Sequence, residues 1–102
     1  MSVAGTYKIR VKTPAGLQEG KMTLVVRGDL LTGMFEYSAG NSVLQDCRVK
    51  GNAVEFNAKI KTPFGQMKAF VTGVVKGDSF SGVAKLPFGS AQIEGIRIIK
   101  GE

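Results

Sequence analysis

The sequence predicts an all-β fold, a closed eight-stranded antiparallel barrel in which the strands follow one another up and down. Three observations predict it. Turn signals recur roughly every 12 residues, the segments between them alternate apolar and polar residues, and the chain matches itself at a shift of 49 residues. Closure removes the two edges that an open sheet would expose to other chains, and a two-layer sandwich is the alternative. At 102 residues, the chain forms a single domain, residues 1–102.

In chain order, the expected strands are 5–12, 18–27, 30–37, 42–50, 53–61, 66–76, 79–86 and 90–99. The first shows the pattern clearly, because Tyr7, Ile9 and Val11 share one face and charged residues share the other. In the fourth, the same counting places Gln45 inside with Val43 and Cys47. This period of two with β-branched and aromatic residues is typical of half-buried strands.

The last expected strand has a turn-to-turn spacing one residue longer than its counterpart at 43–49, which predicts a bulge. Counting along it places Glu94 on the inner face with Ile96 and Ile98. A register shifted by one residue is the alternative, and it would place Glu94 in solvent.

Two turn types alternate along the chain. Gly-Asp or Gly-Asn pairs occur at 28–29, 51–52 and 77–78, and loops that end in glycine occur at 14–16, 38–40, 63–65 and 87–89, three of them with proline. Glycine, asparagine and aspartate suit the tight turns of hairpins. In an up-and-down barrel the two types lie at opposite ends, which we call the Gly-Asp end and the Pro-Gly end.

Comparison of the sequence with itself predicts an internal duplication. At a shift of 49, KTPAG at 12–16 falls on KTPFG at 61–65, and VVRGD at 25–29 falls on VVKGD at 74–78. Thirteen of 53 aligned pairs are identical, where background composition predicts roughly three or four. The repeats are 5–52 and 53–102, and each holds two hairpins, so four hairpin units build the barrel.

The pattern from GTY at residue 5 through KTPAG, VVRGDLLTGMF and DCRVKGNAVEF to PFGSAQIEGIR resembles small bacterial calycin-like, or lipocalin-like, barrel domains. The resemblance covers nearly the whole chain. Its motifs are turn and core motifs, so it implies the fold and supplies no catalytic residues. It also implies a setting, since such domains occur alone or beside metabolic enzymes such as amidohydrolases and oxidoreductases.

Composition narrows the function. The net charge is +6, but the basic residues are scattered singly, which does not favour nucleic acid as a partner. There is no apolar run of the ~20 residues that span a membrane, and residues 1–5 lack signal-peptide features, so we expect a cytoplasmic protein. Cys47 is the single cysteine, which excludes an internal disulfide. There is no histidine, the commonest general base and metal ligand. We expect no metal and no cofactor.

The Pro-Gly end carries the candidate binding rim. Phe64 and Phe88 are expected at the tips of adjacent hairpins, and Lys12, Lys61 and Lys85 stand just before three of the loops. An apolar rim with a positive collar suits an apolar or amphipathic ligand, with an anionic metabolite as one option. The alternative is that the phenylalanines plug this end of the barrel.

Polar and aromatic side chains expected in the lumen complete the candidate ligand site. A buried amide or carboxyl needs a hydrogen-bond partner, so an inward Gln45 or Glu94 would orient a ligand. The tyrosines have a plain core role as their alternative. The predicted ligand-binding residues are Tyr7, Phe35, Tyr37, Gln45, Phe56, Phe64, Phe80, Phe88 and Glu94.

Three functions are compatible with these features. The leading one is a small-molecule-binding barrel. The second is a non-catalytic accessory subunit of a metabolic enzyme. The third is a cofactor-free cyclase or isomerase, with Glu94 and Tyr7 as its acid–base groups in the lumen. Apolar residues expected on the outer face favour a homo-oligomer or an enzyme partner; they are Val25, Phe70 and Val74, with Leu44 or Ile99.

Overall fold

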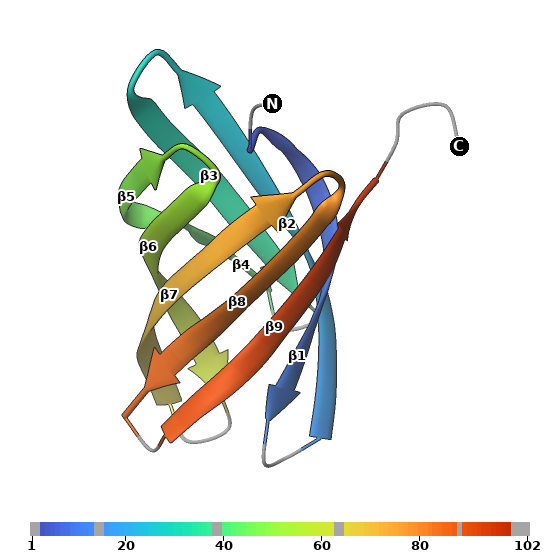
Figure 1. Cartoon of the computed structure of the whole chain (residues 1–102). Helices are drawn as coiled ribbons and strands as arrows, with labels where there is room; N and C mark the ends of the chain where they lie inside the picture. Colours follow the sequence, from blue (N-terminus) through green and yellow to red (C-terminus); the bar gives the residue numbers. More distant parts are fainter. Residues whose placement is uncertain (1–2, 14–15, 38–39, 63–64, 88, 99–102) are drawn as a thin grey trace.

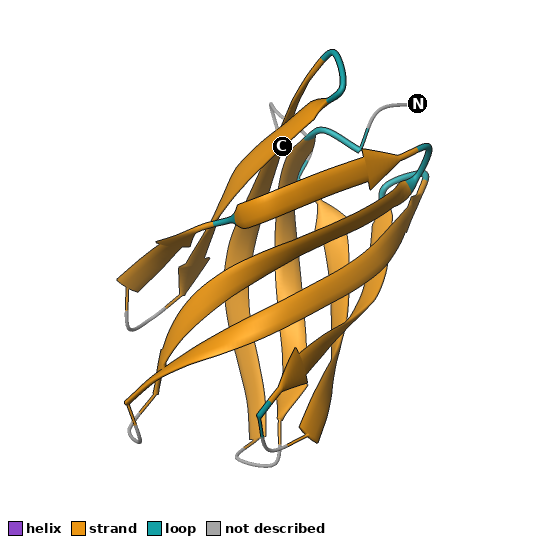
Figure 2. Cartoon of the chain, turned by 90° about the vertical axis from the view of Figure 1, so that its left-hand side faces the viewer, coloured by secondary structure: helices purple, strands orange, loops and turns teal. Residues whose placement is uncertain are grey.

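The structure, a computed structural model, describes residues 3–13, 16–37, 40–62, 65–87 and 89–98. These residues form strands and short loops (Figure 2). Among them there is no helix long and apolar enough to cross a membrane. The strands are β1 (Gly5–Thr13), β2 (Gly16–Arg27), β3 (Leu30–Tyr37), β4 (Gly40–Val43), β5 (Gln45–Lys50), β6 (Ala53–Thr62), β7 (Gly65–Lys76), β8 (Ser79–Leu86) and β9 (Gly89–Arg97).

The strands form one antiparallel sheet in the order β4-β3-β2-β1-β9-β8-β7-β6-β5. Strands β1 and β9 lie side by side (Figure 1), and their pairing runs from Tyr7↔Arg97 to Lys12↔Gln92. The first and last strands are therefore joined, and the sheet curls into a nearly closed barrel. The prediction of an all-β up-and-down antiparallel barrel is confirmed.

Within the residues that the structure describes, the barrel has nine strands rather than the eight predicted, because the expected strand 42–50 is divided. Its first part, β4, pairs with β3, and its second part, β5, pairs with β6. At the break, the Leu44 amide donates to the Gly33 carbonyl at 2.9 Å. A register shift follows between Gln45 and Arg48, and Asp46 has a φ of 52°. This β-bulge transfers the chain from one neighbouring strand to the other.

The bulge also reverses the faces of this segment. Ser42 and Leu44 are buried before it, and Cys47 faces the core after it, while Gln45 is exposed. The prediction that Gln45 points inward is therefore wrong, and so is the outward placement of Leu44. A strict period of two cannot count across a bulge, because the extra residue exchanges the inner and outer faces.

The register predicted for the last strand is also wrong. Ile93 and Gly95 are buried, whereas Glu94 is exposed and Ile96 is 67% exposed. Strand β9 has no bulge, since its pairing with β8 runs unbroken from Ser79↔Ile96 to Leu86↔Gly89. This inner position holds a glycine because the core has no room for a larger side chain there: a Cβ on Gly95 would lie 2.8 Å from Cγ2 of Ile9.

Side chains fill the barrel towards the Gly-Asp end. The Tyr7 and Phe80 rings lie 6.1 Å apart at 55°, and Val3 from the N-terminal segment is buried with them. Phe56 also belongs to this core. Gly28, Gly51 and Gly77 begin the turns at this end with φ of 62°, 59° and 58°, as type II′ hairpin turns require. The turn chemistry expected here is confirmed.

Of the outer apolar residues predicted from sequence, Val25, Phe70 and Val74 are exposed. Ile99 lies outside the described residues, as do Phe64 and Phe88 of the expected rim. The interpretation of that rim as a ligand contact or as a plug therefore stays a prediction.

Candidate functional site

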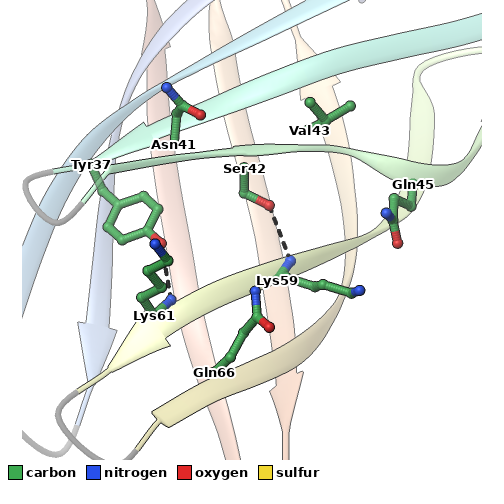
Figure 3. Close-up of a pocket in the computed structure, with 8 residues that line it drawn as sticks. All are labelled: Tyr37, Asn41, Ser42, Val43, Gln45, Lys59, Lys61 and Gln66. Carbon is green, nitrogen blue, oxygen red and sulfur yellow. Dashed lines mark hydrogen bonds between the residues drawn. The ribbon is translucent and has the colours of Figure 1, made fainter.

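The barrel wall is interrupted between β4 and the second half of β6. In the described part of the chain no backbone ladder joins these strands, and side-chain hydroxyls from β4 and from the end of β3 bond to β6 instead. The Lys59 amide donates to Oγ of Ser42 at 3.1 Å, and the Lys61 amide donates to the Tyr37 hydroxyl at 2.9 Å (Figure 3). We call this interruption the seam.

The alternation of hydrogen bonds in an antiparallel ladder explains which groups face the seam. The Leu44 amide bonds to β3, so Val43, one residue before it, and Asn41, three residues before it, direct their backbone groups to the opposite side. On β6, the bonds to Ser42 and Tyr37 show that Lys59 and Lys61 direct their amides towards the seam. Within the described residues, both edges therefore direct backbone groups towards the seam without a backbone ladder between them, and on β6 the two hydroxyls accept from the Lys59 and Lys61 amides.

A cleft of about 200 Å³ lies over the seam. Its lining combines two lysines, two hydroxyl groups, three amide side chains and one valine, without a carboxylate. Figure 3 shows these side chains, which are Tyr37, Asn41, Ser42, Val43, Gln45, Lys59, Lys61 and Gln66. Two lysines and no carboxylate among the lining residues give the cleft a positive potential, which suits an anion.

The cleft is placed towards the Pro-Gly end, because Tyr37 ends β3, Lys61 nearly ends β6 and Gln66 lies at the start of β7. Tyr37 is held by stacking against Phe35, with ring centroids 5.2 Å apart and an angle of 17°. Packing therefore fixes the ring that carries one bridging hydroxyl. Ser42 is buried, so the other bridge is fixed as well.

The residues predicted from sequence do not form one site. Tyr37 and Gln45 both line the cleft, although Gln45 reaches it from the outer face. Tyr7, Phe56 and Phe80 are buried in the core, and Glu94 lies on the outer face away from the lumen. Sequence reasoning missed Ser42, Lys59 and Gln66 as site residues. One signal for Ser42 exists, because it is a polar residue two positions before the apolar Leu44.

A second polar cluster lies inside the barrel at the Gly-Asp end. Tyr7 donates its hydroxyl proton to the Val3 carbonyl at 2.6 Å and accepts from Nη2 of Arg97 at 2.8 Å. Nη1 of Arg97 lies 3.2 Å from Oδ1 of Asp78. The hydrogen bond to Tyr7 and then the charge of Asp78 raise the pKa of the Arg97 guanidinium, against an opposing effect of burial. These contacts join Tyr7, Arg97 and Asp78 in one network, which fits a structural role.

Other chemistries find little support in the described residues. No three histidine, cysteine, aspartate or glutamate side chains gather there in a group that would hold a metal ion. Cys47 is half-buried, and burial followed by the charge of Asp46 raises the pKa of its thiol. A raised pKa reduces the thiolate fraction, which is the reverse of what a nucleophilic cysteine needs.

Comparisons with known proteins bear on the fold. No family model matches the sequence, and no curated protein matches it. Among solved structures, a redesigned β-barrel is similar to this chain, with a TM-score of 0.71 and 12% sequence identity. The similarity covers 96% of this chain and 92% of the other. At this identity it shows the barrel fold alone.

Proposed function

We propose that this protein is a small-molecule-binding barrel that holds an anionic or amphipathic ligand in the cleft over the seam. One observation carries the proposal. Where the barrel wall lacks a backbone ladder, the cleft combines the ammonium groups of Lys59 and Lys61 with hydroxyl and amide side chains, and with no carboxylate. A few convergent polar groups in a concavity are typical of ligand sites.

The size of the cleft restricts the ligand class. At about 200 Å³, it is smaller than the roughly 300–1,000 Å³ of pockets for drug-sized ligands. It therefore suits a small aromatic acid or the anionic head of a longer molecule. The two lysines would bind the carboxylate, and the amides of Asn41, Gln45 and Gln66 would bind further oxygens. The exposed side chain of Val43 offers an apolar contact.

The sequence resemblance to calycin-like domains supports a ligand-binding role, and it also keeps the accessory-subunit hypothesis in view. The hypothesis of a cyclase or isomerase loses its main support, because Glu94 was to supply the acid in the lumen and lies on the outer face.

Titration of the isotope-labelled protein with benzoate, followed by amide NMR shifts, tests the proposal. We expect saturable shifts at Lys59, Lys61 and Ser42, and weaker ones with benzyl alcohol, which has the ring without the charge. Lys59→Gln and Lys61→Gln should each weaken binding about tenfold, since charged hydrogen bonds contribute about 1.5–3 kcal/mol.

Lys76→Gln, at the Gly-Asp end, is the matched control and should leave the affinity for benzoate unchanged. The proposal fails if Lys76→Gln weakens binding as much as the seam variants, or if the shifts map to another face of the barrel.

A further inference from the structure

A second hollow, on the outer face of β5–β8, has a volume of about 710 Å³. We call it the outer groove. One wall consists of partly exposed aliphatic side chains, Val74 on β7 and Val83 on β8, which are diagonal neighbours in the register. The other wall is the β5–β6 hairpin, with Arg48, Lys50 and Glu55. The groove is therefore apolar on one side and charged on the other.

The groove has a physical cause in the core beneath it. Gly73 and Gly82 face each other in the β7–β8 register. A Cβ at Gly73 would lie 2.4 Å from Cζ of Phe80, and one at Gly82 would lie 2.6 Å from the Thr72 carbonyl oxygen. Without these side chains the two strands approach the Phe80 ring closely, and both glycines line the groove.

The same chain carries a shape that fits such a groove. The β2–β3 turn projects beyond the other turns of the Gly-Asp end (Figure 1). Leu30 follows this turn and is 60% exposed, with Asp29 beside it. A projecting leucine beside a carboxylate matches a groove with one aliphatic and one cationic wall. On the charged wall, within the described residues, Glu55 forms an ion pair with Arg48 at 3.8 Å. Lys50 is therefore the residue of this wall that could pair with the Asp29 carboxylate.

We propose that the outer groove binds the β2–β3 hairpin of a second copy of this chain, with Leu30 against Val74 and Val83 and with Asp29 against Lys50. The hairpin and the groove both lie at the Gly-Asp end. Two copies that meet through these ends can exchange hairpins, and such an exchange closes the pair rather than continuing into a filament. The seam cleft lies towards the opposite end, so this inference is independent of the proposed ligand site.

Sedimentation velocity over a range from low micromolar to near-millimolar concentration tests the proposal. The net charge of +6 on each chain opposes association, so the experiment uses physiological ionic strength, at which the screening length is about 8 Å. We expect a reversible dimer. Leu30→Ser and Val83→Lys should each weaken it by about tenfold or more, because each disrupts the buried centre of the contact.

Leu17→Ser is the matched control, since Leu17 is 52% exposed but lies at the Pro-Gly end. It should leave the dimer unchanged. Far-UV circular dichroism checks the fold of each variant, and Ser81→Lys replaces Val83→Lys if the latter unfolds.

Charge exchange gives the sharpest test. Asp29→Lys and Lys50→Glu should each weaken the dimer, and the double variant should restore it, because each hairpin then meets a groove of the opposite sign. A monomer at every concentration overturns the proposal. So does equal weakening by Leu17→Ser, or a double variant that dissociates as readily as the single ones.

Discussion

Nη2 of Arg97 lies 2.8 Å from the hydroxyl oxygen of Tyr7, and this hydrogen bond joins the last strand to the first across 90 positions of sequence. The guanidinium carbon also lies 5.3 Å from the centroid of the Tyr7 ring, within the range of a cation–π contact. Because Tyr7 in turn donates to Val3, the pair ties the N-terminal segment to β9. Closure of the Gly-Asp end therefore depends on a polar contact inside an apolar core.

Replacing Arg97 by methionine should lower the free energy of unfolding by about 2–3 kcal/mol, because the hydrogen bond to Tyr7 involves a charged donor in a partly buried site. The Arg97 side chain is 16% exposed and that of Arg48 is 81% exposed. Arg48→Met is thus the control, and its loss should stay below about 1 kcal/mol. Urea denaturation measures both, and equal losses would contradict a structural role for the Arg97–Tyr7 pair.

Cys47 should titrate above its ordinary pKa of 9.0, because burial and the charge of Asp46 both disfavour the thiolate. A raised pKa in the folded state stabilises the protein below the unfolded value, and this contribution is lost as the pH rises through the folded value. The rate of alkylation by iodoacetamide against pH gives the midpoint, with urea-unfolded protein as the control. A folded midpoint at or below the unfolded one would show that the assigned environment is wrong.

Ser42→Ala should raise the rate of hydrogen exchange at the Lys59 amide, and Tyr37→Phe should do so at the Lys61 amide, because each loses its acceptor. Ser42→Ala should also cost about 1–2 kcal/mol of stability, since the hydroxyl is buried. Exchange followed by NMR resolves the two amides. Thr23→Ala removes a hydroxyl from the β1–β2 pair, where Thr23 Oγ1 lies 3.3 Å from that of Thr6, and should leave both rates unchanged.

Gly73→Ala should destabilise the barrel by about 1–3 kcal/mol, because the new methyl group would overlap the Phe80 ring. Adding Phe80→Leu should recover part of this loss, since the two changes then share one space, and coupling between contacting residues typically reaches about 0.5–3 kcal/mol. Thermal denaturation of the four-member cycle measures the coupling. Strictly additive losses would mean that Gly73 is not required for the approach of the ring.

Turn residues and the alternation of apolar and polar residues were sufficient to predict the fold. The ranges 30–37 and 79–86 match β3 and β8 residue for residue, because tight turns with glycine mark their ends. The alternation in β1 placed Tyr7 and Ile9 inside correctly. These patterns involve residues next to each other in sequence, so they can be recognised without knowing which strands are neighbours in space.

The errors at Gln45 and Glu94 share one cause, the apolar residues from which the inner face was counted, and Gln45 lies in addition at the bulge. The two residues occupy equivalent positions at the shift of 49, and so do Leu44 and Ile93, which are both buried. Counting started from apolar residues that turned out to lie outside, such as Val43 and Ile96. Gly95 takes an inner position of β9 because Ile9 and Phe80 leave no room for a side chain there, and Arg97 takes another because it donates to the Tyr7 hydroxyl. Counting along β9 alone cannot reveal these contacts with other strands.

The seam was beyond sequence reasoning for a related reason. It arises where β4 ends its pairing with β3 and β5 begins its pairing with β6, so its position depends on four strands at once. Tyr37 was a candidate because of its ring and hydroxyl. Ser42 and Lys59 were not, since each reads alone as an ordinary strand residue.

The pairing of β1 with β9 has a consequence for the newly made protein. Strand β1 emerges from the ribosome before β2 through β8, and its edge stays unpaired until β9 has been made. Until then, that edge is a template for β-strands of other chains. Slow synthesis or truncation before residue 89 should therefore favour aggregation, whereas the pairing of β9 with β1 removes this exposed edge.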